Sequence, residues 1–183
     1  MSLSEKPSKR QRASRRVVLV GIMAATVECG KLALAFIPNV EVVTLFLALF
    51  SYVFGFAGIA AALVFVCIEP LIWGFGTWVV SYLIYWPTVS LVFFFLGRAK
   101  LKNRLAVTLI VAVLTFLFGV LSSLIDIGLL SGFFDKFFER FFVYYARGAV
   151  FYAVHVVSNI IIFFFLFNFL LVKLDKIKSV ILN

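Results

Sequence analysis

Two pairs of polar side chains interrupt apolar segments of this chain at helical spacings. Glu28 and Lys31 lie three residues apart, and His155 and Asn159 lie four apart, so each pair occupies one face of a helix. A charge left unpaired in the middle of a membrane costs about 2.5–3.5 kcal/mol, so Glu28 and Lys31 must face protein, water or each other. Each pair is either a structural contact within a helical bundle or part of a ligand cavity.

A third group of candidate residues crowds the stretch from residue 69 to residue 86. It contains Glu69, Trp73, Tyr82 and Tyr85, with glycines at positions 74 and 76. Trp and Tyr side chains often form a belt at the membrane–water interface, which is one interpretation of this stretch. A belt does not explain an acidic residue next to a proline, or glycines that suit a backbone bending around a ligand. The stretch is therefore also a candidate binding site.

Several kinds of chemistry are disfavoured by motifs that the sequence lacks. There is no G-x-x-x-x-G-K-[ST] motif to hold nucleotide phosphates, and the nearest fragment is only Cys29-Gly30-Lys31-Leu32. The single histidine and the lack of H-E-x-x-H leave no metalloprotease-like site, and no clustered carboxylates suggest a paired-acid site. We expect no catalytic residues, no metal site, no cofactor and no ATP hydrolysis by the chain itself.

The elements that must carry these residues are membrane-spanning helices. Hydrophobic residues make up 64% of the 183 residues and charged residues only 14%, and the mean hydropathy is +1.17. A membrane helix needs roughly 20 mostly apolar residues. We therefore predict an all-α integral membrane protein with about six transmembrane helices in a compact bundle. The spans are expected near residues 17–37, 42–54, 57–73, 78–97, 105–130 and 147–172.

The segments outside the spans are short. We predict a basic cytoplasmic tail at residues 1–16, a six-helix membrane domain at 17–174 and a second cytoplasmic tail at 175–183. No small-residue cleavage site follows a short apolar run, so we expect no removable signal peptide. Pairs of phenylalanines recur about once per helical turn in residues 131–146, which predicts a segment at the membrane interface. It is either an anchor or a lid over an outward-facing pocket.

The distribution of basic residues predicts the orientation of the bundle. With the amino terminus in the cytoplasm, three inward-facing clusters hold most of the 17 basic residues, and Lys31 lies within the first span. Both termini are therefore expected in the cytoplasm, and the net charge of +9 reflects topology rather than nucleic-acid binding. The inward residues are Lys6, Lys9, Arg10, Arg12, Arg15, Arg16, Arg98, Lys100, Lys102, Arg104, Lys173, Lys176 and Lys178, and the outward ones are Lys136, Arg140 and Arg147.

Parts of the chain resemble the substrate-binding S components of energy-coupling factor (ECF) transporters. The resemblance lies in a first helix rich in small residues, in the run Ile37-Pro38-Asn39-Val40-Glu41-Val42-Val43-Thr44, and in glycine-containing segments at 55–58 and 73–78. The Pro-Asn-Val-Glu run is its most specific part. The resemblance extends over most of the chain beyond residue 17.

This resemblance implies a multi-pass protein of the bacterial cytoplasmic membrane that captures a vitamin on the outer side. The implied partners are a coupling transmembrane subunit and two cytoplasmic ATPase subunits. Family members carry a small-x-x-x-small motif on the first helix that packs against the coupling subunit. Gly21 and Ala25 fit that spacing here, and Ala25 with Cys29 forms a competing register.

The chain is most similar to the cobalamin-specific CbrT type of S component, which makes cobalamin the expected substrate. The alternatives are an S component for another vitamin or precursor, an intramembrane enzyme that draws on the buried polar residues and Asp126, and an adaptor without a ligand. The substrate-binding residues implied by the resemblance are Asn39, Glu41, Glu69, Trp73, Tyr82, Tyr85, His155 and Asn159.

Overall fold

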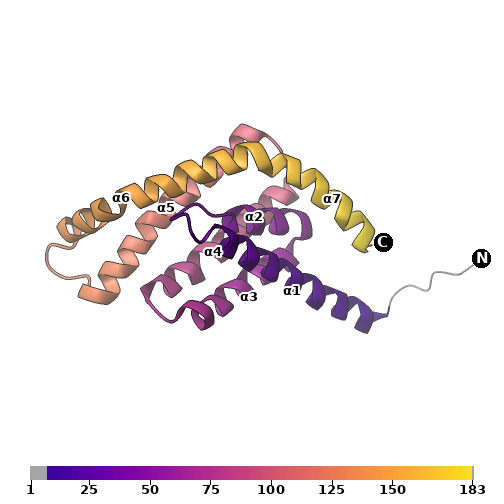
Figure 1. The fold of residues 1–183 in the computed structure, drawn as a ribbon, viewed down its shortest axis with the longest axis horizontal. Coiled ribbons are helices and arrows are strands. Elements are labelled where there is room, and N and C mark those ends of the chain that lie inside the picture. Colours follow the sequence, from indigo (N-terminus) through magenta and orange to yellow (C-terminus); the bar gives the residue numbers. More distant parts are fainter. Residues whose placement is uncertain (1–7, 183) are drawn as a thin grey trace, which may run out of the picture.

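The computed structural model describes residues 8–182 and consists of helices joined by short connections (Figure 1). No β-strand occurs in this part of the chain, which confirms the prediction of an all-α protein. The elements are α1 (Lys9–Leu34), α2 (Val43–Phe54), α3 (Phe56–Trp73), α4 (Thr77–Arg98), α5 (Arg104–Ser131), α6 (Phe137–Ile162), the π-helix η1 (Phe163–Phe167) and α7 (Asn168–Leu182).

Among residues 8–182, five helical stretches are long and apolar enough to cross a membrane. They are α1, α3, α4, α5 and the continuous helix that α6, η1 and α7 form together. α2 has only 12 residues, or about 18 Å at 1.5 Å per residue, against a hydrocarbon core of about 30 Å. The prediction of a multi-pass helical membrane protein agrees with this arrangement. The sixth span and the cytoplasmic termini stay predictions.

The helices extend into segments that the sequence suggested were tails or connections. α1 begins at Lys9, where the Ser8 hydroxyl accepts a hydrogen bond from the Gln11 backbone N–H at 3.3 Å, so half of the predicted tail 1–16 is helical. Residues 1–7 of that tail lie outside the described residues. α7 likewise continues to Leu182 through the predicted tail 175–183. From Phe137 onward the predicted interfacial segment 131–146 forms the first part of α6, and its position at the membrane interface stays a prediction.

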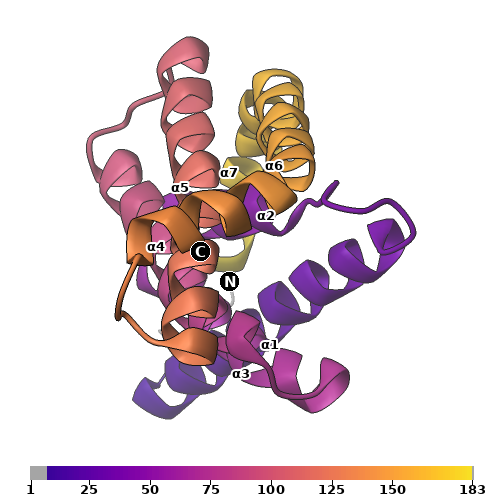
Figure 2. The same cartoon turned by 90° about the vertical axis from the view of Figure 1, so that its left-hand side faces the viewer.

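α2 lies in the interior of the bundle (Figure 2) and packs against α1, α3, α4, α6 and α7. Two glycines on neighbouring helices permit this close packing. A Cβ atom on Gly58 would lie 2.3 Å from the Ser51 backbone nitrogen, and one on Gly97 would lie 2.4 Å from the Tyr52 carbonyl oxygen. α2 is therefore surrounded by protein, and the positive φ of Gly55 turns the chain directly into α3.

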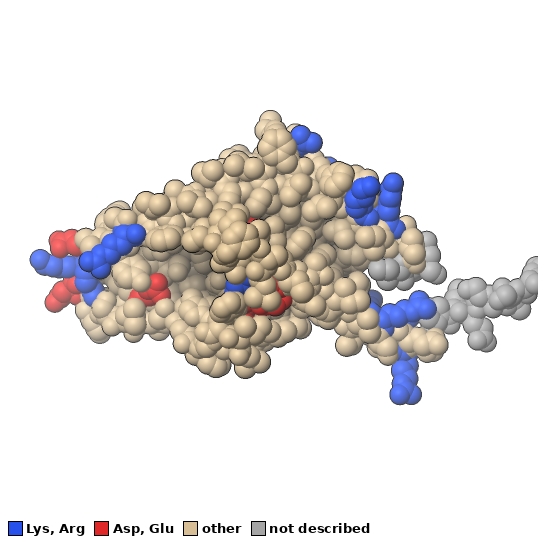
Figure 3. All heavy atoms as spheres, in the orientation of Figure 1, with Lys and Arg blue, Asp and Glu red and all other residues tan. Residues whose placement is uncertain are grey.

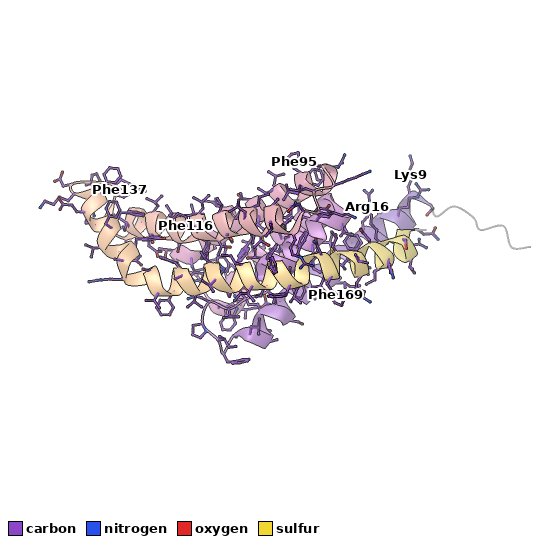
Figure 4. The ribbon with its side chains drawn as sticks, turned by 90° about the horizontal axis from the view of Figure 1, so that it is seen from above. Lys9, Arg16, Phe95, Phe116, Phe137 and Phe169 are labelled. Atoms are coloured by element: carbon purple, nitrogen blue, oxygen red, sulfur yellow. The ribbon has the colours of Figure 1, made fainter. Side chains whose placement is uncertain are left out.

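The outer surface separates charged ends from an apolar middle. Figure 3 shows charged side chains gathered mainly toward the two ends of the long axis, and between them a mostly uncharged surface with a small charged group near its centre. Phe95, Phe116 and Phe169 lie on this outer surface and are 59%, 51% and 59% exposed (Figure 4). The start of α1 and the end of α7 lie at the same end of the long axis (Figure 1). An apolar band between charged ends is the surface that a lipid bilayer requires.

Candidate functional site

A cavity of about 330 Å³ lies where the connection between α1 and α2 meets α3, α4, α5 and α6. Five of the eight predicted binding residues line it: Asn39, Glu41, Trp73, Tyr82 and His155. The other three lie one layer behind and contact lining residues. Glu69 pairs with Lys31, Tyr85 packs on Trp86 and Asn159 donates to Glu41. Residues that are distant in the sequence are thus brought together in one place.

Glu41 fastens the α1–α2 connection to α6. Its carboxylate accepts hydrogen bonds from the Thr44 backbone N–H at 2.8 Å and from the Thr44 hydroxyl at 2.5 Å, which satisfies the first turn of α2. It also accepts one from Asn159 Nδ2 at 2.9 Å and lies 3.1 Å from His155 Nε2. Burial opposes ionisation of Glu41, but the hydrogen bonds from His155, Thr44 and Asn159 outweigh it and lower the pKa of this carboxyl.

A second charged group lies behind the cavity and joins α1 to α3. The Lys31 ammonium pairs with Oε2 of Glu69, whose side chain is fully buried. The ammonium also lies 5.1 Å from the ring centroid of Trp73 and 5.6 Å from that of Tyr82. Glu28 is close enough to interact electrostatically with both Lys31 and Glu69, yet its oxygens make no hydrogen bond. The ion-pair partner of Lys31 is therefore Glu69, on another helix, rather than Glu28.

Aromatic rings complete the wall of the cavity. Tyr82 meets Trp86 edge-on with 5.5 Å between centroids, and His155 meets Phe118 edge-on at 5.4 Å. Tyr85 and Trp86 are only 4% and 3% exposed, so they belong to the core and not to an interfacial belt. Trp73 is half-exposed and lies at the rim of the cavity.

Eight of the thirteen lining residues were absent from the predicted binding set, and three of these eight, Lys31, Trp86 and Phe118, carry a charged or aromatic side chain. Lys31 is a charged residue in an apolar helix, and Trp86 directly follows the predicted binding residue Tyr85. The sequence therefore offered a reason to add both residues to the predicted binding set. Phe118 lies in a uniformly apolar span, where nothing distinguishes it from its neighbours. Asp126 lies outside this cavity, where it accepts hydrogen bonds from the Thr77 hydroxyl and, at 3.1 Å, from the Tyr144 hydroxyl.

A larger groove of about 920 Å³ lies near the basic end of the molecule. Its lining is mostly apolar, and three cationic side chains contribute to it: Arg16, Arg98 and Lys178. Gly21 borders the groove, and no atom lies within 4 Å of the position that a Cβ atom on it would take. The predicted partner-packing residues Gly21 and Ala25 are both exposed. The face of α1 that carries these two residues is therefore exposed, whereas Met23 and Ala24 on the opposite face are buried in the bundle.

Comparisons of the chain with models of known protein families, with curated proteins and with solved structures find no significant match. Within residues 8–182 no three or more His, Cys, Asp or Glu side chains come together as metal ligands would. What the cavity does offer is a fixed carboxylate, an ion pair and aromatic walls, which are suited to holding a small molecule reversibly.

Proposed function

We propose that this chain is the substrate-capturing membrane subunit, or S component, of an ECF-type importer. In this role it binds a vitamin or vitamin precursor in the 330 Å³ cavity and releases it with the help of an ATP-driven coupling module. The observation that carries the proposal is the cavity itself. Polar residues inside a membrane bundle are costly, and here they gather around one space of ligand size.

The orientation of the charges supports capture from outside. The cavity lies at the carboxyl end of α1, whereas the basic clusters lie at its amino end and at the end of α7. Basic residues favour the cytoplasmic side, so the cavity would face outward in the cytoplasmic membrane of a bacterium. The chain would then bind its substrate from the outside, before the ATPase subunits hydrolyse ATP on the cytoplasmic side.

The volume of the cavity favours a small substrate. Pockets for drug-sized ligands measure about 300–1,000 Å³, so a space of about 330 Å³ fits a molecule of one or two rings. Cobalamin, the substrate expected from the resemblance, is several times larger than such a molecule. Its binding stays a prediction that requires the α1–α2 connection and the rim at Trp73 to move apart. For the conformation described, we propose a smaller vitamin or precursor.

The groove near Gly21 supports a partner subunit at the other end. A groove that is apolar and open along α1 suits a helix of a coupling subunit, because small residues let two helices approach closely. Two cytoplasmic ATPase subunits would drive that coupling subunit. The chain itself would not be an enzyme.

An intramembrane enzyme is the second candidate, and the geometry does not favour it. Its polar residues are engaged with one another: Lys31 with Glu69, and His155 and Asn159 with Glu41, beside the cavity, and Asp126 with Tyr144 outside it. A catalytic site needs a nucleophile or base and its orienting group around one reacting atom. These groups instead hold different helices together.

Growth on single vitamins tests the proposal. The chain would be produced with an ECF coupling subunit and both ATPases in a host that cannot make or import the vitamin supplied. Rescue is expected on one vitamin, with cobalamin included in the panel, and only when all four proteins are present. Rescue that persists with inactive ATPases, or failure of the chain to co-purify with the coupling subunit, would contradict the proposed function.

A further inference from the structure

The charges around the 330 Å³ cavity do not balance. Three carboxylates, those of Glu28, Glu41 and Glu69, share this region with one ammonium, that of Lys31. The carboxyl groups therefore outnumber the ammonium, and three carboxyl groups would still face only two cations if His155, 3.1 Å from Glu41, carried a charge. Buried charges normally have partners, so the surplus indicates room for a further cation.

Unpaired hydrogen-bond acceptors lead to the same conclusion. Oε1 of Glu69 and Oδ1 of Asn159 belong to fully buried residues and have no donor, and both Glu28 oxygens also lack one. Buried polar atoms without a partner are rare in native proteins. Most of these unsatisfied atoms belong to residues behind the lining and need a donor, which favours a ligand that carries N–H groups, whereas Trp86 Nε1, on the lining itself, lacks an acceptor.

Lys31 shows how these walls hold a cation. Its ammonium lies over the faces of Trp73 and Tyr82 while it pairs with Glu69. Aromatic faces attract cations because their π-electrons present negative charge, and the effect grows when the cation is desolvated. Trp86 and Phe118 add two more rings to the same cavity. An anion, by contrast, would meet the Glu41 carboxylate and a lysine that is already paired.

We infer that the ligand of this cavity is a small planar organic cation, such as a cationic nitrogen heterocycle, with Glu41 as its counter-ion. The inference rests on the proposed function for the idea that the cavity captures a substrate, and it adds the chemical class of that substrate. Glu41 suits this role because Thr44, Asn159 and His155 fix the position of its carboxylate at the cavity wall. The ring would lie against Tyr82 and Trp86.

Three probes of matched shape test the charge preference. They are 1-methylnicotinamide, nicotinamide and nicotinate, which share one flat ring and carry a positive, a neutral and a negative charge. Binding to the purified full-length protein in detergent micelles would be measured by calorimetry and by tryptophan fluorescence, since Trp73 and Trp86 line the cavity. The cation is expected to bind at least about tenfold more tightly than the anion, a difference of about 1.4 kcal/mol.

Two variants and a control locate the binding. Glu41→Gln is expected to remove the preference for the cation, and Trp73→Leu, which changes a half-exposed side chain, is expected to weaken cation binding about fivefold without affecting folding. Glu139→Gln is the matched control, because its side chain is 72% exposed and is outside this cavity. It should bind all three probes as the wild type does.

Equal or tighter binding of nicotinate would overturn the inference. The absence of binding of every probe up to about 10 mM would also overturn it, because a Kd of about 1 mM is detectable at that concentration. Retention of the cation preference in folded Glu41→Gln would overturn the role of Glu41. The outcome of the growth assay does not depend on the outcome of these binding measurements. Cation binding without ATP-driven uptake would remove the proposed function and leave this inference, whereas uptake of an anionic vitamin would do the reverse.

Discussion

The carboxylate of Glu41 has two structural tasks. It satisfies the start of α2 through Thr44, and it binds α6 through His155 and Asn159. Hydrogen bonds to an ionised group contribute about 1.5–3 kcal/mol each, roughly twice the value of neutral ones. The negative charge of Glu41 therefore stabilises the connection that forms one wall of the cavity.

Replacing Glu41 by glutamine is expected to lower the stability of the protein by about 2 kcal/mol at neutral pH, because charge-assisted hydrogen bonds are lost. The pKa of Glu41 lies below its ordinary value of 4.5 in the folded protein, so the stabilisation is complete above pH 4.5 and is lost as the pH falls through the folded-state pKa. The difference in stability between the wild type and Glu41→Gln should disappear in that acidic range.

Thermal unfolding in detergent measures this difference, with Glu139→Gln as the control. A variant as stable as wild type at neutral pH would contradict the expectation.

The pair of Lys31 and Glu69 predicts a second outcome at the same scale. Lys31→Met leaves the buried Glu69 carboxylate without a partner, and breaking a buried pair in this way costs about 3–5 kcal/mol. The double variant Lys31→Met, Glu69→Met removes both charges and should recover most of the loss. The free energies of unfolding of the single and the double variant would be measured by denaturant titration and compared. If the double variant were less stable than the single one, the pairing would not be the cause.

Among the elements, α2 is the one whose position depends most on its neighbours. The sequence marks its carboxyl end well, because Gly55 and Gly58 interrupt the apolar run at residue 54. It does not reveal that α2 is enclosed by protein, since an apolar helix facing lipid has the same composition. The close contact of Gly97 with the Tyr52 backbone distinguishes a helix enclosed by protein from one that faces lipid. This contact joins residues that are far apart in the sequence, so only the folded structure reveals it.

This packing predicts opposite effects of alanine at two glycines. Gly97→Ala places a Cβ atom 2.4 Å from the Tyr52 carbonyl oxygen, and such overpacking costs about 1–3 kcal/mol. Gly21→Ala meets no atom within 4 Å and should be neutral or stabilise α1 by up to about 1 kcal/mol, since alanine favours helix. Melting temperatures in detergent separate the two. Equal stability of both variants would mean that α2 and α4 lie farther apart than described.

A bulky residue at Gly21 tests the role of α1 in partner binding. Gly21→Leu is expected to leave ligand binding unchanged, because no atom beyond its own helix backbone lies within 4 Å of its Cβ position and the residue lines the groove rather than the cavity. It should reduce co-purification with an ECF coupling subunit at least about tenfold, since close helix packing needs small residues. Ala33→Leu, another exposed small residue of α1, is the control. Normal co-purification of Gly21→Leu would exclude this face of α1 as the contact.

For the whole molecule, the sequence predicts the fold class better than the continuity of its helices. Hydropathy summed over long segments is insensitive to single residues, so the apolar helices were located well. Residues 137–146 contain Glu139 and Arg140 among phenylalanines, which is typical of a connection, yet they extend α6. The site was predicted only as a set of polar residues. Which of them pair depends on the rotation of each helix, as the choice of Glu69 over Glu28 by Lys31 demonstrates.

The position of the two ends predicts the topology. The start of α1 and the end of α7 lie at the same end of the molecule and carry basic clusters, so both should face the cytoplasm (Figure 1). A fluorescent protein that folds only in the cytoplasm, fused to either terminus, should be bright in both fusions. An exported enzyme fused in the same places should stay inactive and serves as the complementary control. One bright and one dark fluorescent fusion would show an odd number of spans.

The continuous helix formed by α6, η1 and α7 touches both functional regions. His155 lines the cavity, and Lys178 borders the groove, where its ammonium donates to the Val53 carbonyl at 2.6 Å. The two residues are about 35 Å apart along one helix axis, with a π-helix between them, a feature that commonly bends helices. The same helix therefore contributes one side chain to the cavity and another to the groove. If it moves as one body, thermodynamic reciprocity requires the partner to change ligand affinity by the same factor as the ligand changes partner affinity.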